Sequence, residues 1–293
     1  MIKRETVTEA MYNAIRLGAT KMPPDIREAL ERAMNEETDP MAKKHLEISL
    51  QNADMSEKGN GLVCADTGFP MFFVHLGRDT QIEGGFNIIQ KCAEEATARA
   101  TAECFLRPTM VHPLTRKKPG DNVGPGMPKV ELFFDRDGDG MEILAAPKGG
   151  GSENMSALKM LKPSDGRQGV VDFVTQTVIN AGGNPCPPVI VGVGLGGTFE
   201  MCAQIAKRAL LRKVGEPNPD PRYAELEAEI LEKINSSGVG PQGLGGNVTS
   251  LAVHILHHGA VGAEAVFGVI AVSGMVHQIT ASVKEEHHAV PVF

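Results

Sequence analysis

The chain has 293 residues, of which 42% are hydrophobic and 22% are charged, a composition typical of one large globular domain or two small ones. Its 36 acidic residues outnumber its 29 basic residues and give a net charge of -7, which argues against nucleic acid as a partner. The opening stretch lacks the apolar core of a signal peptide, and no window holds 18 uninterrupted apolar residues. We therefore expect a cytoplasmic protein that does not enter a membrane.

The first half of the chain predicts helices followed by strands. Apolar residues at three- and four-residue spacing predict helices over residues 5–54, and we expect them to form a helical bundle. "GLVCADTG" and "PMFFVHLG" resemble two short strands, and "GGFNIIQKCAEEATARATAECFL" resembles one long helix that carries Cys92 and Cys104. The segment "LRPTMVHPLTRKKPGDNVGPGMP" is rich in proline and glycine, so we expect a long loop that lines a site.

The second half alternates strands and helices. Strand patterns occur in "KVELFF", "MEILAAP" and "VIVGVG", and helix patterns in "SALKML", "RQGVVDFVTQTVINAGG", "TFEMCAQIAKRALL" and "AELEAEILEKINSS". Glycine turns then alternate with apolar strands in the tail. These patterns predict an α/β fold of mixed helices and strands with an N-terminal helical region, in a single domain over residues 1–293.

Two glycine- or aspartate-rich motifs favour structural roles. "GVGLGG" matches the dinucleotide-binding pattern between a strand and a helix, but no second strand ending in an acidic residue follows about twenty residues later. We therefore favour close packing of the strand against the helix. "DRDGDG" matches the start of a calcium-binding EF-hand loop, yet Ala146 stands where the bidentate glutamate belongs. Because its flanks resemble strands, we expect a β-hairpin turn there.

The glycine cluster in "PKGGGSEN" favours a binding role over a flexible turn. Three successive glycines precede Ser152 and a predicted helix, so bare backbone N–H groups could bind a small carboxylate with help from the helix dipole.

The five cysteines lie at positions 64, 92, 104, 186 and 202 without any C-x-x-C pair, which does not resemble a secreted disulfide framework. Cys64 in "VCADTG" and Cys186 in "NPCPP" each adjoin a predicted strand beside glycine or proline, where a thiolate could bind metal. Taken singly, such a cysteine is more often a buried apolar thiol.

Several longer strings together carry a family resemblance. "VCADTG", "LRPTMVHPL", "GDNVGPG", "PKGGGSENMSALKMLKPSDG", "NPCPPVIVGVGLGGT" and "GVGPQGLGGN" occur in this order, over roughly residues 8–280. The chain thereby resembles the alpha subunit, or N-terminal domain, of class I fumarate hydratases and L(+)-tartrate dehydratases. The resemblance implies a fumarase alpha-type fold and a 4Fe-4S cluster held by three cysteines, whose fourth iron binds a hydroxyl and a carboxylate of the substrate.

The resemblance also implies roles for individual residues. It places Cys64 and Cys186 at two cluster ligands and Asp66 at an acid or base beside the cluster. Arg107 falls on a carboxylate-binding arginine and Gly150 on a backbone contact to the substrate. His258, or its neighbour His257, corresponds to a histidine near the substrate.

The third cluster ligand is the departure from the family pattern. It would lie near Val276, but no cysteine follows Cys202. The cluster could therefore be labile, lost, or held by another group such as His277 or Cys202.

The resemblance predicts the alpha subunit of an iron-sulfur hydro-lyase that acts on a small hydroxy-dicarboxylate, fumarate or malate first and L-tartrate next. A separate beta subunit would supply the remaining site residues, so a homo- or hetero-oligomer is expected. The alternative is a non-catalytic alpha-like subunit, or a dicarboxylate-binding module, that has lost the cluster.

Overall fold

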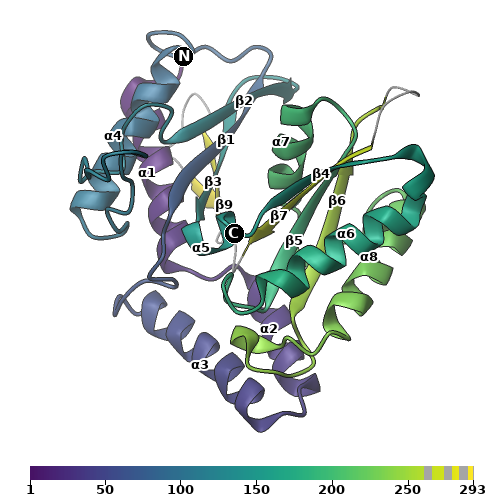
Figure 1. Cartoon of the computed structure of the whole chain (residues 1–293). Helices are drawn as coiled ribbons and strands as arrows, with labels where there is room; N and C mark the ends of the chain where they lie inside the picture. The colour runs from purple at the N-terminus through teal and green to yellow at the C-terminus, as the bar shows by residue number, and fades with distance from the viewer. Residues whose placement is uncertain (261–265, 274–278, 284–289, 293) are drawn as a thin grey trace. The chain divides into compact units, whose positions relative to one another are not determined.

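The computed structural model describes residues 1–260, 266–273, 279–283 and 290–292, with side chains through residue 260 (Figure 1). Residue contacts divide the chain into two compact units. The first comprises Met1–Pro23, Asn52–Gly150 and His277–Phe293, and the second comprises Pro24–Gln51 and Gly151–Val276. Helices and strands occur in both, so the predicted α/β fold with N-terminal helices is confirmed. The single domain over residues 1–293 stays a prediction.

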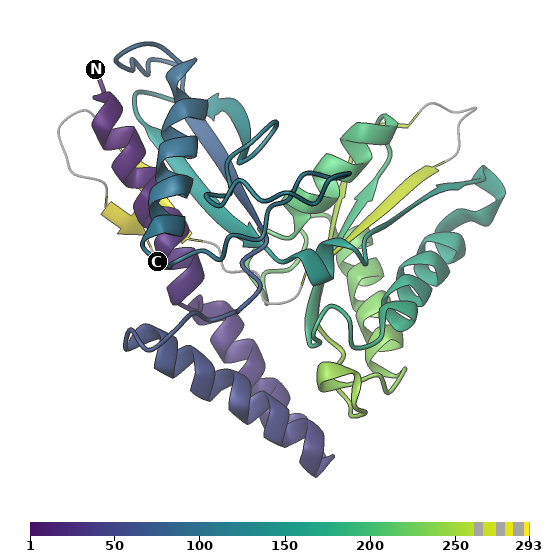
Figure 2. The same ribbon diagram turned by 60° about the vertical axis from the view of Figure 1, so that its left-hand side comes forward.

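The first unit packs two helices on one sheet. The sheet has the strand order β2-β1-β3-β8-β9 among the described residues. Helices α1 and α4 lie side by side (Figures 1 and 2), and their contact is rich in fully buried alanines that allow the two backbones to approach closely. The elements are α1 (Arg4–Thr20), α4 (Ile88–Ala102), β1 (Phe69–Gly77), β2 (Lys129–Arg136), β3 (Met141–Lys148), β8 (Ile279–Val283) and β9 (Val290–Val292).

Strand β1 separates β2 from β3. Phe72 of β1 is opposite Val130 of the parallel β2 and opposite Ala145 of the antiparallel β3. The prediction of a β-hairpin across "DRDGDG" is therefore wrong. The apolar run of β1 is buried along almost its whole length, as expected of a central strand, whereas β2 is the exposed edge.

The second unit is a sheet of order β4-β7-β5-β6 with helices on both faces. Figure 1 shows α7 on one face and α6 and α8 on the other. The elements are α2 (Pro24–Glu36), most of α3 (Pro40–Glu57), α5 (Gly150–Glu153), α6 (Gly166–Ala181), α7 (Phe199–Ala209), α8 (Pro221–Asn235), β4 (Ala157–Leu161), β5 (Val189–Leu195), β6 (Ser250–His257) and β7 (Val266–Ser273).

The N-terminal helices do not form the expected bundle. Helix α1 packs against α4 and β3 in the first unit, whereas α2 contacts β6 in the second. The apolar faces of α1 and α2 are therefore buried against different sheets. Sequence periodicity identifies such a face but not its partner.

The alternation along β5 explains the "GVGLGG" motif. Val189, Val191 and Val193 pack with α6 and α8, while Gly192 and Gly194 face α7. A Cβ atom added at Gly192 would lie 2.2 Å from the carbonyl oxygen of Ala206, and one added at Gly194 would lie 2.1 Å from that of Cys202. Helix α7 thus rests directly on the strand backbone, which confirms that the motif packs a strand against a helix.

Two side chains of the same unit bind the backbone of β6 at Ile255. Buried Glu227 accepts the backbone N–H of Ile255 at 2.6 Å, and Asn218 donates to the carbonyl oxygen of Ile255 at 3.0 Å. Arg212 pairs with the Glu227 carboxylate at 2.5 Å, so this buried charge is compensated. The pairing fixes the strand that ends next to His258.

Three predictions of local structure are wrong. "SALKML" contains strand β4 rather than a helix, because its five strand residues pair with β7 and six residues are too few to reveal a helical period. "GLVCADTG" forms a loop whose carbonyl groups bind side chains, as when Asn52 donates to Val63 at 2.7 Å. Helix α4 ends at Ala102, and Cys104 adopts a left-handed conformation with φ 65°.

Candidate functional site

The loop before β1 brings two predicted site elements together within the first unit. A Cβ atom added at Gly149 would lie 3.3 Å from the carbonyl oxygen of Asp66 and 3.4 Å from its Oδ2. At Gly150 the distance to Asp66 Oδ2 would be 3.6 Å. The backbone at positions 149 and 150 thus faces the half-buried Asp66 carboxylate, and a side chain at either position would contact that carboxylate. The glycine cluster and the Asp66 loop, which lie more than 80 positions apart in the sequence, are therefore neighbours in the first unit.

Gly68 is required for this arrangement. It has φ +53°, and a Cβ atom there would lie 1.9 Å from the carbonyl oxygen of Lys148. The backbone of the Asp66 loop thus touches the backbone that leads into the glycine cluster. Helix α5 begins inside the cluster, at Gly150, and has only one turn, so the expected help from a helix dipole is small.

Arg107 is held beside the same loop. Its backbone N–H donates to Thr67 Oγ1 at 2.9 Å, and its Nη1 donates to the carbonyl oxygen of Ala65 at 3.1 Å. The guanidinium is exposed, so it can still bind a carboxylate. Sequence reasoning missed Thr67 and Asn122, which orient this segment, although both lie inside the strings "VCADTG" and "GDNVGPG".

Cys186 belongs to the second unit and lies in a constrained turn. It has φ 58°, and its N–H donates to the carbonyl oxygen of Gly183 at 3.0 Å. The carbonyl oxygen of Pro187 accepts the N–H of Gln242 at 2.8 Å. A Cβ atom at Gly183 would lie 2.6 Å from the Gln242 carbonyl oxygen, so the loop "GVGPQGLGGN" packs directly on the cysteine turn.

His258 follows β6 and abuts the two glycines after β5. Its N–H donates to the carbonyl oxygen of Leu195 at 2.8 Å. A Cβ atom at Gly196 would lie 2.3 Å from the His258 carbonyl oxygen, and one at Gly197 would lie 3.4 Å from the His258 side chain. The ring of the neighbouring His257 instead stacks on the Tyr223 ring, with 4.4 Å between the two ring centres. His257 also lines a cavity of about 460 Å³.

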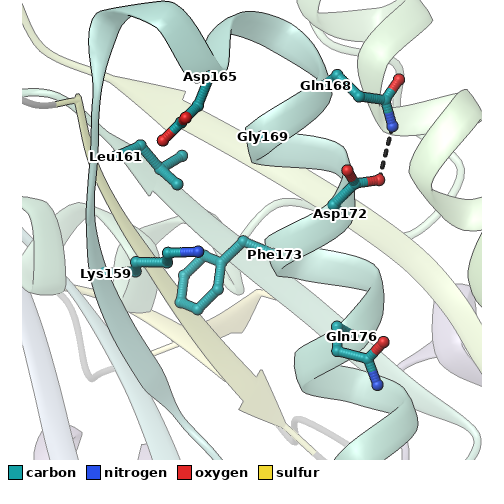
Figure 3. Close-up of a pocket in the computed structure, with 8 residues that line it drawn as sticks. All are labelled: Lys159, Leu161, Asp165, Gln168, Gly169, Asp172, Phe173 and Gln176. Atoms are coloured by element: carbon teal, nitrogen blue, oxygen red, sulfur yellow. Dashed lines mark hydrogen bonds between the residues drawn. The ribbon is translucent and has the colours of Figure 1, made fainter.

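A second cavity, of about 510 Å³, lies between β4 and α6 in the second unit (Figure 3). The Lys159 ammonium lies 5.8 Å from the centre of the Phe173 ring, and Gln168 donates to Asp172 at 2.6 Å. All residues that line the cavity fall within positions 159–176, so none of the predicted site residues is among them.

Comparison with known proteins decides the family. The model of the family described as "Fumarate hydratase (Fumerase)" matches residues 8–274. The chain belongs to this family. It is 45% identical over 250 residues to the Methanocaldococcus jannaschii protein named "Putative L(+)-tartrate dehydratase subunit alpha", which covers 85% of this chain and 87% of the relative. It is 36% identical over 250 residues to the "L(+)-tartrate dehydratase subunit alpha" of Escherichia coli (strain K12), and the match covers 85% of this chain and 81% of the relative.

The cysteines of this fumarate hydratase family member differ in their surroundings. Cys64, Cys104 and Cys186 are exposed, whereas Cys92 and Cys202 are fully buried. Burial raises the pKa of the Cys92 thiol, and the Cys202 sulfur lies 3.1 Å from the carbonyl oxygen of Gly194. Thiolate ligands need access to the metal, which the exposed Cys64, Cys104 and Cys186 have and the buried Cys202 lacks.

The third ligand has no assignment. Val276 and His277 lie outside the described residues. Across the described part of the chain, no three His, Cys, Asp or Glu residues gather closely enough to hold a metal ion. The same residues include no helix that is both long and apolar enough to span a bilayer.

His254 makes stability depend on pH. It lies in β6 with 2% of its surface exposed, and its Nδ1 is 3.2 Å from the Ala209 carbonyl oxygen. Burial, assisted by the Arg212 charge, lowers its pKa to about 4. As the pH falls, His254 therefore becomes protonated near pH 6.5 in the unfolded chain but only near pH 4 in the folded chain. The contribution of neutral His254 to the free energy of unfolding is fully present above about pH 6.5. It is lost as the pH decreases toward 4, by up to about 3 kcal/mol.

Urea unfolding at pH 7 and at pH 4.5 measures this effect. The loss of unfolding free energy between the two pH values should be smaller by about 2 kcal/mol in His254→Gln than in the unmodified chain. An equal loss in both proteins would show that other groups carry the pH dependence.

Proposed function

We propose that the chain is the alpha subunit of an iron-sulfur hydro-lyase that reversibly removes water from a small hydroxy-dicarboxylate, with fumarate or malate and L-tartrate as the candidate substrates. Membership of the fumarate hydratase family supports the reaction class. The observation that carries the proposal is the meeting of Arg107, Asp66 and Gly149–Gly150 around one loop.

The proposed reaction divides among these residues. Loss of water breaks one C–H bond and one C–O bond, forms a C=C bond, and needs a base at the carbon and an acid at the departing hydroxyl. Arg107 binds a substrate carboxylate, and the open backbone at Gly150 lets the substrate reach Asp66. The Asp66 carboxylate takes or returns a proton. His258 is the second candidate for proton transfer.

Cys64 and Cys186 would hold the 4Fe-4S cluster. When bound, such a cluster acts as a Lewis acid toward the substrate hydroxyl. Both thiols are exposed, and both lie outside helices and strands.

A beta subunit is the proposed partner. The curated relatives named above are called alpha subunits, and the chain spans more than four-fifths of their length. We propose that the beta subunit contributes further substrate-binding groups, in a homo- or hetero-oligomer.

The second candidate function is a non-catalytic alpha-like subunit or dicarboxylate-binding module without a cluster. It is favoured by one observation, the absence of any cysteine after Cys202. Iron and sulfide content after anaerobic reconstitution separates it from the hydro-lyase.

The proposal is tested by producing the chain with its cognate beta subunit, reconstituting iron and sulfide anaerobically, and assaying fumarate hydration and L-tartrate dehydration. We expect turnover of at least one acid by the complex and little by the chain alone. Equally fast turnover by the isolated chain would refute the need for a beta subunit. A complex that holds iron but converts neither acid would refute the proposed activity.

A further inference from the structure

We infer that Asn122, with Thr67, is a positioning residue that holds Arg107 where it can bind the substrate carboxylate. The inference rests on the proposed function, because it takes Arg107 as the carboxylate-binding group. It concerns residues of the first unit only.

The Asn122 side chain is fully used in hydrogen bonds. It is 1% exposed. Its Oδ1 accepts the N–H groups of Thr109 at 3.0 Å and Met110 at 3.1 Å. Its Nδ2 donates to the carbonyl oxygen of Arg107 at 2.8 Å and to Thr101 Oγ1 at 3.1 Å. Two donors and two acceptors are satisfied at once, which fixes the orientation of the amide.

These bonds join the Arg107 segment to a rigid element. Thr101 lies at the end of α4, and its hydroxyl lies 2.8 Å from the Thr97 carbonyl oxygen one turn earlier. The Arg107 segment itself belongs to the stretch 103–128, which has no helix or long strand between α4 and β2. Asn122 therefore anchors an otherwise irregular segment to the helix.

Thr67 holds the other side of Arg107. It is 3% exposed, and its Oγ1 accepts the Arg107 N–H at 2.9 Å. The peptide groups on both sides of the Arg107 Cα atom are thus tied, one to Thr67 and one to Asn122. With its backbone fixed at two points, the exposed guanidinium is directed to the Asp66 loop, where Nη1 meets the Ala65 carbonyl oxygen. Loss of either tie should misplace the guanidinium, and small displacements of this kind cost substantial substrate binding.

Two substitutions with nearly unchanged shape isolate this role. In Asn122→Asp the side chain can still accept from Thr109 and Met110, but an ionised carboxylate cannot donate to Arg107. Two oxygens then face each other at the Arg107 carbonyl. Thr67→Val removes the acceptor for the Arg107 N–H, whereas Thr67→Ser keeps it.

The test is a double-mutant cycle in the reconstituted complex with the beta subunit. We expect Asn122→Asp to raise KM about tenfold with kcat changed less than about threefold, because the lost interaction is one of substrate binding. In an Arg107→Ala background the same change should alter kcat/KM less than about twofold, since the group that Asn122 positions is gone. Thr67→Val should behave as Asn122→Asp does, and Thr67→Ser as the wild type.

Asn87→Asp is the matched control. Asn87 lies exposed before α4, makes no capping hydrogen bond, and undergoes the same amide-to-carboxylate change. Melting temperatures of all complexes, with and without L-tartrate or fumarate, identify any variant that fails to fold; the Thr67 pair then decides the question.

The outcomes separate the inference from the proposed function. Equal effects of Asn122→Asp in the two backgrounds, or an unchanged KM in both Asn122→Asp and Thr67→Val, would overturn the inference while the wild type remains active. A wild-type complex that turns over neither acid overturns the proposed function, and the inference with it.

Discussion

Cys64→Ser and Cys186→Ser are expected to lose bound iron and all measurable turnover, whereas Cys104→Ser keeps both. All three side chains are exposed, and serine replaces a single atom in each. Serine is a poorer ligand than thiolate for iron-sulfur clusters, so the effect should appear only where the thiol holds the cluster. Iron and acid-labile sulfide, measured after anaerobic reconstitution of the complex, report it directly.

Cys104 is a demanding control. Like Cys186 it is exposed and has a left-handed backbone, with φ values of 65° and 58°. General loss of an exposed thiol, or strain at such a position, would affect both variants alike. Full iron content in Cys186→Ser would show that this cysteine is not a ligand, and absence of iron from the wild type under every condition would favour the non-catalytic alternative.

Asp66→Asn is expected to lower kcat by about 100- to 10,000-fold with a much smaller change in KM. Proton transfer by a positioned side chain contributes about this factor, and an amide of the same shape cannot perform it. The change keeps the close contact with Gly149 and Gly150, so the loop should hold its conformation. Steady-state kinetics of the reconstituted complex with both acids measure the effect.

Asp79→Asn provides the matching loss of one negative charge in the same unit. Its carboxylate is 62% exposed beyond the end of β1 and lies 3.4 Å from Arg78 at the surface. Its kinetics should equal those of the wild type. If kcat of Asp66→Asn stays within tenfold of the wild-type value, Asp66 is not the proton-transfer group.

The sequence by itself determined the features that local patterns encode. Pro24 and Pro221 begin helices at the first helical position, where a missing N–H costs nothing, and Asp220 caps α8 by accepting the Arg222 N–H at 3.0 Å. Residues 189–195 form the strand that their apolar run predicts. The glycines of "GVGLGG" were rightly interpreted as packing positions, because the dinucleotide site lacked its second, more distant element.

The sequence also predicted the part of the candidate site that lies in the first unit. The family resemblance predicted Asp66, Arg107 and the glycine cluster as site residues, and the structure brings them to one loop of the first unit. The strings that carry the family resemblance are long, so they predict site residues even where the local fold was wrongly predicted, as around Cys64.

Only the tertiary structure decided which elements meet. Strand β1 enters between β2 and β3, so two strands that are consecutive in the sequence do not pair, and the partner of β4 lies about a hundred residues later in β7. Thr67 and Asn122 look like ordinary loop residues until the chain folds to place them on either side of Arg107, which lies 40 residues after Thr67 and 15 residues before Asn122. Hydrogen bonds between such distant groups leave no periodic trace in the sequence, because their geometry is created by the packing of the helix and sheet that carry them.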